Sequence, residues 1–332
     1  MSKEDKIAFN SAIVIVAYNC WDHIFKCLDS IAFQTVKPQQ VVVVNNGDKP
    51  QTQVMEQLLD YPFVSLIEPG ENLGFARGCN LGVEYADKAD WIALLNPDTE
   101  LSDNWLEVMR DAVVENPLCV SFGSRLLVAE NPSLVDGVGD CYHYSGMAWR
   151  KGHMSNKEEV QSAYDVIFSP CAAAALYKRS VYTALGGLDE DFFCYLEDVD
   201  LGFRFLLNGY ESLNVNNAEV LHVGSVTTVR KSNFYVFYGQ RNLIWVYIKN
   251  MPLPFLIVFL PFHIFINLLG IIRYALVGKF SVVVKAKVSA LKRFFYFWGK
   301  RVEIQKGRKV SLMCLFKRFD KSFFPSVSRL LK

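Results

Sequence analysis

The stretch WIALLNPDTELSDNWLE, residues Trp91 to Glu107, decides the fold class of this chain. Its apolar start predicts a buried strand over 91–95, and the run Asn96-Pro97-Asp98 ends that strand. In α/β proteins, ligands bind beside the carboxyl ends of such strands. Asp98 would therefore hold a metal ion or cap the helix expected from Trp105. Ser102 and Asp103 can serve as that cap, which favours the metal.

The same alternation extends towards the N-terminus. Short, continuous apolar runs rich in β-branched residues are typical of strands buried on both faces, and here they alternate with helical spacing. The predicted strands span 12–17, 41–44 and 64–67, and the predicted helices span 22–33 and 78–86. This rhythm predicts an α/β fold with a parallel sheet and helices on both faces. Further on, the sequence predicts helices over 176–185 and 198–209.

Charge is distributed unevenly along the 332 residues. The net charge is +1, but the stretch from Gly278 to Lys332 holds 15 lysines and arginines and only two acidic residues. This basic, aromatic end is expected to face anions. The eight cysteines form no Cys-x-x-Cys pair, which argues against a zinc ribbon. The first ten residues lack the apolar core of a signal peptide, so we expect reduced thiols in the cytoplasm.

Two segments near the C-terminus predict contact with a membrane. The run 254–272 is nearly uncharged and close to spanning length, but it contains two prolines, His263 and Asn267. A true span and a half-inserted helical hairpin both remain open. Beyond it, apolar residues recur at three- and four-residue steps from Val288 to Val302, with lysines and arginines between them. Such a helix lies in a membrane interface or docks on the body of the protein.

Four polar clusters fall at predicted strand ends or helix starts. They are Tyr18-Asn19, the run 45–48, Asn96-Pro97-Asp98 and the run 197–200. The first three can converge on one crevice and form a nucleotide-diphosphate site that holds Mg²⁺ or Mn²⁺. The fourth carries three carboxylates in an apolar frame. It is either a solvated helix start or a partly buried general base.

Six motifs together resemble glycosyltransferase family 2, and within it the rhamnosyltransferase-like enzymes of bacterial surface polysaccharide (O-antigen) assembly. In order, they are IVIVAYN, VVVVNNGD, ENLGFARGCNLGV, ALLNPDTEL, GGLDEDFFCYLEDVDLGFR and LHVGSVTT. The resemblance implies a GT-A fold over 10–250, with nucleotide-sugar binding in about 10–125 and acceptor binding and the catalytic base in about 126–250. The remaining stretch, 251–332, would be a hydrophobic and basic membrane-associating region.

The resemblance also implies roles for single residues. Asp198 would be the catalytic base, supported by Glu197, and the metal would lie at Asp98 and His222. The donor would be bound by Ala17, Tyr18, Asn19, Asn45, Asn72, Gly74, Phe75, Arg77, Asn80 and Asn96.

Several of these positions have simpler explanations or depart from the family pattern. Gly74 and Gly78 suit a tight turn and close helix packing, and His222 suits a core histidine. Asn45 and Asn96 stand where many relatives have aspartate.

The resemblance implies inverting, metal-dependent sugar transfer. We expect the enzyme to add a single sugar, because YGQRNLIW (238–245) lacks the QxxRW pattern of processive synthases. The expected donor is dTDP-L-rhamnose, and the expected acceptor is a saccharide linked to undecaprenyl diphosphate or a growing polysaccharide. We expect the enzyme at the cytoplasmic face of the bacterial inner membrane, peripheral or with one anchor, and without nucleic acid. The alternative is a non-catalytic sugar-binding or scaffold protein on a degenerate fold. A nucleotidyltransferase would show a glycine-rich, lysine-containing loop near the N-terminus, which the sequence lacks.

Overall fold

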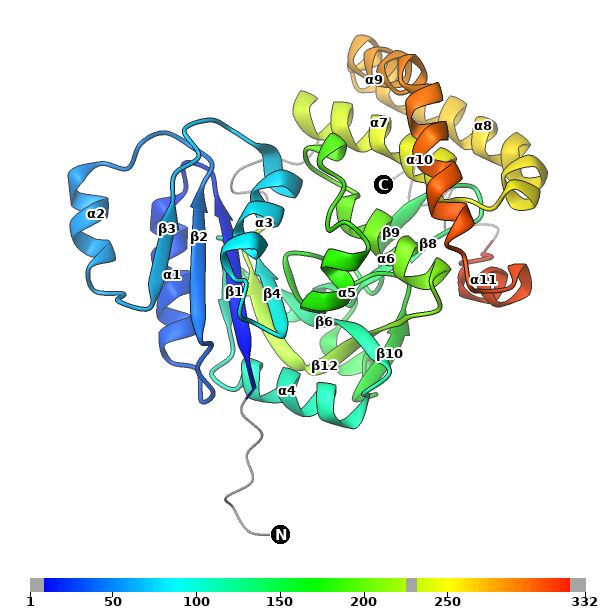
Figure 1. Cartoon of the computed structure of the whole chain (residues 1–332). Coiled ribbons are helices and arrows are strands. Elements are labelled where there is room, and N and C mark those ends of the chain that lie inside the picture. The colour runs from blue at the N-terminus through cyan, green and yellow to red at the C-terminus, as the bar shows by residue number, and fades with distance from the viewer. Residues whose placement is uncertain (1–8, 225–231, 323–332) are drawn as a thin grey trace.

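The computed structural model describes residues 9–224 and 232–322. The last four residues of the motif LHVGSVTT and the final ten residues of the basic end lie outside these ranges. A ten-stranded mixed sheet runs through the centre of the molecule, with the strand order β10-β12-β6-β11-β4-β1-β2-β3 and with β5 on β12 and β7 on β6 (Figure 1).

The first half of the chain has the predicted parallel arrangement. The strands are β1 (Ser11–Ala17), β2 (Gln40–Asn45), β3 (Val64–Ile67) and β4 (Trp91–Leu95), and the helices are α1 (Trp21–Ala32), α2 (Thr52–Leu58), α3 (Gly74–Tyr85) and α4 (Trp105–Glu115). β1 pairs in parallel with both β2 and β4, so all three strands end at the same edge of the sheet.

Alternate residues of these strands face opposite layers. Ile13 and Ile15 pack with α1 and α4, whereas Val14 and Val16 pack with α3. Both faces are therefore buried, which explains why β1 is a continuous apolar run.

The second half departs from the prediction at one element. The sequence predicted a helix over 176–185, but residues Ala174–Lys178 form the strand β11, antiparallel to β4 and β6, and only Arg179–Ala184 form a helix, α5. The side chains of 174–177 are buried on both faces of the sheet, between the two layers of helices, and only Lys178 at the end of the strand is exposed. A short apolar run does not distinguish a buried strand from a buried helix, and here the gap between β4 and β6 selects the strand.

The remaining strands extend the sheet and form a hairpin beside it. They are β5 (Thr99–Leu101), β6 (Cys119–Val128), β7 (Asn131–Gly137), β8 (Asp140–Tyr142), β9 (Ala148–Arg150), β10 (Tyr164–Ile167) and β12 (Glu211–His222). The helix α6 (Glu197–Leu207) begins one residue before the predicted start. β8 and β9 form a separate two-stranded sheet and place Asp140 opposite Arg150.

In the described part of the chain, the sheet is followed by the helices α7 (Asn233–Asn250), α8 (Leu253–Leu276), α9 (Phe280–Lys292), α10 (Phe294–Lys306) and α11 (Leu312–Arg318). The amphipathic pattern predicted as one helix is divided at Arg293 between α9 and α10, because the chain turns there to pack Phe297 against Trp245 of α7. Among the described residues, α8 is the one helix long and apolar enough to cross a membrane, by length and composition alone.

Candidate active site

Two strand tips bring Asp98 and His222 together. β5 pairs with the end of β12, with Thr99 opposite His222, and the amide N–H of Val223 donates to the carbonyl oxygen of Asp98 at 3.0 Å. Both side chains are buried, and the Nε2 atom of His222 lies 3.6 Å from the Oδ1 atom of Asp98. The convergence predicted for these two residues is therefore present in the fold.

The helix α4 does not use Asp98 as its cap. Its N-cap is Asn104, which makes no side-chain capping hydrogen bond, and the N–H of Trp105 donates to the backbone carbonyl of Ser102. The expectation that Ser102 or Asp103 caps this helix through its side chain is wrong. The helix does without a side-chain cap because Trp105 and Leu106 anchor it in the core.

Asp136, at the end of β7, links this pair to two further basic side chains, and no sequence motif marked it as a site residue. Its Oδ2 atom lies 2.7 Å from Nδ1 of His222, and its carboxylate also forms ion pairs with Arg150 and His153. Since Asp136 is an acceptor, Nδ1 of His222 carries the proton in this hydrogen bond. The other ring nitrogen, Nε2, is then directed towards Asp98.

The charges around these three residues favour ionised side chains for Asp98 and Asp136, with a positive charge beside them that is either a protonated His222 or a metal ion. Burial alone would raise the pKa of Asp98, but the hydrogen bond from His222 lowers it below its usual value. Burial would likewise raise the pKa of Asp136, but His153, His222 and Arg150 hold it well below its usual range. The pKa of His222 is raised by Asp136 and Asp98 in spite of burial. A divalent cation beside Asp98 and Nε2 would take the place of the proton on that nitrogen.

Asp198 lies in the first turn of α6, half-buried. Its two carboxylate oxygens accept from the backbone N–H groups of Ala172 at 3.1 Å and Val199 at 2.8 Å. Burial raises its pKa, and the two N–H groups and the charge of Arg150 oppose that rise. A fixed carboxylate whose pKa is raised towards neutrality suits a general base.

Within the described ranges, the carboxyl group of Glu197 lacks the pair of N–H donors that holds the carboxylate of Asp198. Its side chain is buried, its Oε2 atom has no hydrogen-bond partner among the described residues, and burial together with the neighbouring Asp198 raises its pKa well above the usual range. Like charges so close do not both ionise at neutral pH. Because only Asp198 has N–H donors on both oxygens, Asp198 takes the charge and Glu197 keeps its proton.

A second group of possible metal ligands adjoins Asp198. One ligand atom from each of Asp140, Cys171 and Asp198 lies within 4.8 Å of the others. Burial raises the pKa of both Asp140 and the Cys171 thiol well above their usual values. Mg²⁺ and Mn²⁺ bind thiolate ligands poorly, so Asp98 and His222 fit such an ion better than a group that includes Cys171.

The loop before α6 is strained. Phe193, Tyr195 and Leu196 all have positive φ angles, of 66°, 72° and 67°. The side-chain amide of Asn242 on α7 lies 2.7 Å from the carbonyl oxygen of Tyr195 and also contacts those of Phe192 and Cys194, at 3.1 and 2.9 Å. Arg241 donates to the carbonyl oxygens of Asp191 and Phe192. Strain of this kind persists only where surrounding contacts enforce it, and it is common at active sites.

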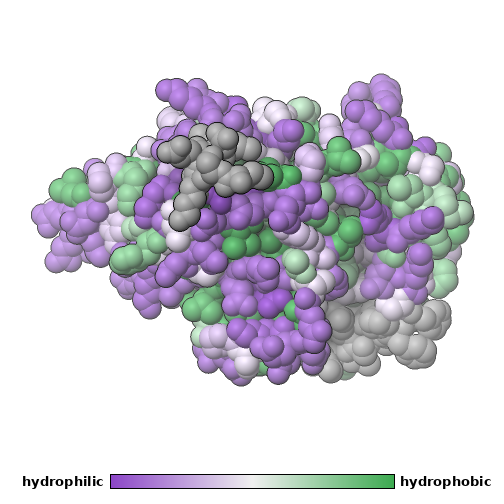
Figure 2. Space-filling model, turned by 90° about the horizontal axis from the view of Figure 1, so that it is seen from below, coloured by the Kyte–Doolittle hydropathy of each residue, from purple (hydrophilic) through white to green (hydrophobic). Residues whose placement is uncertain are grey.

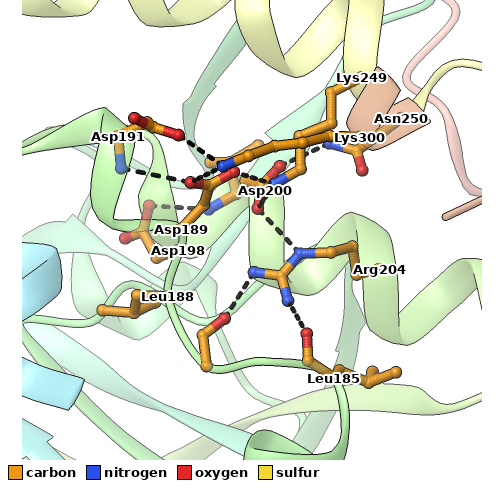
Figure 3. A network of polar contacts seen from close by, with 12 residues as sticks. Leu185, Leu188, Asp189, Asp191, Asp198, Asp200, Arg204, Lys249, Asn250 and Lys300 are labelled. Carbon is orange, nitrogen blue, oxygen red and sulfur yellow. Dashed lines mark hydrogen bonds and ion pairs between the residues drawn. The ribbon is translucent and has the colours of Figure 1, made fainter. Parts of the chain in front are cut away.

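Asp200, the third carboxylate of the cluster, belongs to a buried ion-pair network (Figure 3). Its Oδ2 atom accepts from Arg204 at 2.9 Å and from Lys249 at 2.8 Å, and its Oδ1 atom accepts from Asn250 at 2.7 Å. Lys249 also pairs with Asp189. Asp200 is thus fully engaged in joining α6 to α7.

Lys300 of α10 extends the same network. Its Nζ atom lies 2.6 Å from a carboxylate oxygen of Asp189 and 2.6 Å from one of Asp191. Arg293, between α9 and α10, also pairs with Asp191. Helices α7 and α10 therefore hold the segment that leads into Asp198.

The residues predicted to bind the nucleoside lie at the tips of β1 and β2. Ala17 is buried and Tyr18 is exposed. Asn19 has a positive φ of 50°, accepts from the N–H of Asp48 at 2.8 Å and donates to the Asp48 carboxylate at 3.1 Å. Asn45 donates to the carbonyl oxygen of Asp48 at 2.9 Å. The structure brings these residues together, and their role in base binding stays a prediction.

The start of α3 is held by the strained loop. The N–H groups of Phe75 and Ala76 donate to the carbonyl oxygen of Phe193, and the N–H of Gly74 donates to the side chain of Asn72. Gly74 has a φ of 76°, and a Cβ atom there would lie 2.5 Å from the Phe193 ring. A glycine is therefore required at this position, and the first amides of α3 are already occupied.

Arg77 and Asn80 differ in their freedom to move. Arg77 lies in the first turn of α3, inside the helix rather than before it, and its half-exposed side chain pairs with Glu71 at 3.5 Å and Glu190 at 3.8 Å. Exposed pairs of this kind are weak, so the guanidinium can turn to a phosphate. The amide of Asn80 instead contacts both backbone groups of Leu188 and joins α3 to the 188–190 segment.

Gly78 and Asn96 have local structural roles. A Cβ atom on Gly78 would lie 2.9 Å from Val16, which confirms the close packing expected of α3 on β1. The backbone of Asn96 bonds to Ala173, just before β11, and to the Thr99 hydroxyl, which fixes the turn that carries Asp98. A cavity of about 570 Å³ between α1, β5 and β12 is lined by none of the predicted site residues within the described ranges.

The fold and the site together define a GT-A glycosyltransferase. The glycosyl transferase family 2 model matches residues 12–186, more than half of the chain, and the chain belongs to this family. The family and the α/β fold predicted from the six motifs are confirmed.

Two relatives are rhamnosyltransferases. The chain is 27% identical over 267 residues to the N-acetylglucosaminyl-diphospho-decaprenol L-rhamnosyltransferase of Mycobacterium tuberculosis, covering 70% of this chain and 85% of that protein. It is 25% identical over 219 residues to an O-antigen chain rhamnosyltransferase of Salmonella typhimurium, covering 65% of this chain and 67% of that protein.

Solved structures share the fold at low identity. The S. aureus TarS fragment 1–349 matches with a TM-score of 0.54 and 14% identity, covering 90% of this chain and 89% of that one. GalNAc-T7, solved with UDP, GalNAc and Mn²⁺, matches with a TM-score of 0.59 and 15% identity over 74% of this chain, which spans about half of the GalNAc-T7 chain.

Proposed function

We propose that this glycosyltransferase transfers a single L-rhamnose from dTDP-L-rhamnose to a saccharide carried on a polyprenyl diphosphate, with inversion at the anomeric carbon. The observation that carries the proposal is the half-buried Asp198 carboxylate, which two backbone N–H groups hold in place and whose pKa is raised by burial. The rhamnosyl donor and the lipid-linked acceptor are supported by the names of the two rhamnosyltransferase relatives.

In the proposed reaction, the acceptor hydroxyl attacks the anomeric carbon on the face opposite the diphosphate. The new bond joins that carbon to the acceptor oxygen, the hydroxyl proton passes to Asp198, and the old bond breaks with its electron pair leaving on the diphosphate. The protonated Glu197 adds no second negative charge beside the base. Arg77 exchanges its exposed ion pairs with Glu71 and Glu190 for the leaving diphosphate.

A divalent cation fits beside Asp98 and His222. One carboxylate oxygen and one imidazole nitrogen lie 3.6 Å apart, and the hydrogen bond from the other ring nitrogen to Asp136 fixes the ring. Mg²⁺ or Mn²⁺ held there would supply positive charge for the diphosphate. GalNAc-T7, which shares the fold, was solved with Mn²⁺. We propose that this enzyme works at the cytoplasmic face of the membrane.

A transfer assay tests the proposal. The full chain is incubated with an N-acetylglucosaminyl-diphospho-lipid acceptor and with dTDP-L-rhamnose, UDP-glucose or GDP-mannose, each with Mn²⁺, Mg²⁺ or EDTA. We expect a rhamnosylated product only with dTDP-L-rhamnose and a metal. We expect Asp198→Asn to lower kcat by about 10²–10⁴-fold. If that variant kept most of its activity, Asp198 would not be the base.

Thermal stabilisation separates donor binding from turnover. Saturating dTDP with Mn²⁺ should raise the stability of both the wild type and Asp198→Asn, by about 2.7 kcal/mol at a hundredfold excess over Kd. Asp98→Ala should lose the metal-dependent part of this rise. Binding without hydrolysis or transfer of any donor would instead support the non-catalytic sugar-binding alternative.

A further inference from the structure

A narrow stripe of α8 docks on the body of the enzyme. The ring of His263 stacks on Tyr247 of α7 with centroids 3.8 Å apart, and its Nδ1 atom donates to the carbonyl oxygen of Ser145 at 2.8 Å. One turn further on, the side-chain oxygen of Asn267 accepts from the buried Lys287 of α9 at 2.5 Å. Tyr274, two turns later, is also buried. These positions follow the helical repeat, so one side of α8 faces the protein.

The opposite side of α8 is exposed and apolar. Its large side chains are 50–62% exposed, a fraction unusual for so many neighbouring aliphatic and aromatic residues. They are Ile257, Val258, Ile264, Phe265, Leu268 and Ile272.

Helices α9 and α10 continue this surface. Leu291 is 60% exposed and Phe295 is 86% exposed, and α8 and α9 pack side by side at one end of the molecule (Figure 1). The face seen from below is mostly hydrophilic, with scattered apolar patches (Figure 2). Of the large apolar side chains that are exposed in the described part of the chain, more than half lie between Leu253 and Val302, so the exposed apolar surface is concentrated on the C-terminal helices.

The charges around this apolar surface indicate what kind of partner it binds. Between Leu253 and Lys306 the chain has nine lysines and arginines and a single acidic residue, Glu303. Lys285 and Lys292 are exposed on α9 beside the apolar side chains. Apolar residues with interspersed cations match the acyl chains and anionic headgroups of a lipid bilayer.

The docking contacts decide the orientation of α8. A helix of 24 residues is about 36 Å long, enough to cross a hydrocarbon core of about 30 Å. Crossing would place its midpoint, at His263, halfway through the bilayer. The Ser145 carbonyl and the α7 surface that hold His263 would then lie there too, together with polar backbone that water could no longer reach.

We propose that α8, α9 and α10 bind an anionic bilayer with α8 lying in the plane of the membrane and not crossing it. This deepens the proposed function, on which it rests, because it sets the enzyme at the surface that carries a polyprenyl-linked acceptor. Lys300 of α10 and Lys249 of α7 pair with Asp189 in the segment before Asp198. The base is thereby held at a fixed height above the lipid.

Vesicle sedimentation tests the membrane face. The full chain is mixed with vesicles of phosphatidylethanolamine and phosphatidylglycerol, and separately with phosphatidylcholine alone. We expect stronger binding to the anionic vesicles, and an affinity at least about tenfold lower for the triple variant Phe265→Gln, Leu268→Gln, Ile272→Gln.

The matched control replaces three apolar residues far from α8 that are exposed to a similar or greater extent: Leu59→Gln, Val114→Gln, Leu118→Gln. It should bind vesicles like the wild type. Both variants should keep the melting temperature and the dTDP binding of the wild type, because all six side chains are on the surface. Equal loss of vesicle binding in both variants would overturn the assignment of the face.

Depth-dependent quenching tests the orientation. A fluorophore is attached to a cysteine placed at Ile257, Ile264 or Ile272 in a Cys314→Ser background, which removes the exposed native thiol. These positions span about 22 Å along the axis. In-plane binding predicts one similar depth for all three, about 5–10 Å below the headgroups. If the probe at 264 lay about 10 Å deeper than both others, α8 would cross the bilayer and the proposal would fail.

Two other outcomes would also overturn it. A concentration-dependent dimer that the triple variant abolishes, without vesicle binding, would assign the face to a second copy of the chain. A monomer without vesicle affinity would leave the face without lipid. Rhamnosyl transfer to a water-soluble acceptor is measured in parallel. Vesicle binding without transfer to any acceptor would refute the proposed function alone, and transfer without vesicle binding would refute the membrane face alone.

Discussion

Replacing Asn242 by leucine should disable the base while the enzyme still binds its donor. The amide nitrogen of Asn242 has two hydrogens and three carbonyl oxygens within 3.1 Å, all from the strained loop before Asp198. Leucine has nearly the same shape but no donor, so about two hydrogen bonds are lost. Each loss leaves a carbonyl unsatisfied, at a cost of about 1–3 kcal/mol.

Part of this cost is recovered when the loop relaxes. Three residues other than glycine with positive φ store about 1 kcal/mol or more each, which is released once the loop leaves this conformation. We therefore expect the free energy of unfolding to fall by only about 2 kcal/mol. The displaced Asp198 should lower kcat by about tenfold to a hundredfold, because a shift of about 1 Å has that effect.

The assay combines denaturant unfolding, dTDP binding and steady-state kinetics. We expect dTDP affinity and the donor KM of Asn242→Leu to stay close to those of the wild type. The control is Asn233→Leu on the same helix, which removes one exposed hydrogen bond to Lys279 and should change neither stability nor kcat appreciably. An unchanged kcat in Asn242→Leu, with lowered stability, would refute the idea that this residue positions the base.

Three further predictions concern the charged groups around the base. Asp136→Asn should weaken Mn²⁺ binding about 10–100-fold, because His222 loses the carboxylate that orients it. Titration calorimetry in the presence of dTDP measures this, and an unchanged affinity would contradict it. In the pH profile of kcat/KM, the acidic limb should have its midpoint above the ordinary aspartate pKa of about 3.9, because Asp198 must lose its proton to act and burial raises its pKa. A midpoint at or below that value would contradict this. Lys249→Met should lower the free energy of unfolding by about 3–5 kcal/mol, because it leaves the carboxylate of Asp200 buried with fewer charge partners, and a loss below about 1 kcal/mol in urea unfolding would contradict this.

Much of the parallel half of the fold could be predicted from the sequence because each strand carries its own signal. β1 and β2 are continuous apolar runs ended by polar residues, and both are buried on both faces in the structure. β11 carries no such distinction. Its five residues read equally well as the start of a helix, and only the space between β4 and β6 decides the matter.

Site residues could be predicted where they lie next to a strand that the sequence itself indicates. Residues that reach the site only through contacts between distant parts of the chain could not. Asp98 follows the strand predicted over 91–95, and the pairing of β5 with β12 brings His222, which only the family resemblance indicated, beside it. Asp136 sits at the end of β7 without a motif of its own, and its contact with His222 spans 86 residues of sequence. Asn242 lies in a stretch that the sequence analysis used only to exclude a processive synthase. Nothing local indicates that its amide supports the base.

The three carboxylates of the run 197–200 show why spacing alone could not separate their roles. Asp200 faces α7 and is neutralised by Arg204 and Lys249, so it is structural. Glu197 is buried without a cation and keeps its proton, whereas Asp198 is held by two N–H groups and takes the charge. The deciding partners come from elements far apart in the chain.

The same contacts bind the C-terminal helices to the chemistry. Lys249 of α7 and Lys300 of α10 both pair with Asp189, and Arg293, between α9 and α10, pairs with Asp191. A chain that ended before α8 would lose Lys300 and Arg293, leaving Asp189 with Lys249 alone and Asp191 with neither cation. Because buried carboxylates without cations are costly, removal of the membrane-facing helices should disturb the loop that carries the base. If the C-terminal helices served only as a membrane anchor, they could be deleted without affecting the active-site loop. Because they supply the counter-ions of that loop, their deletion should affect it.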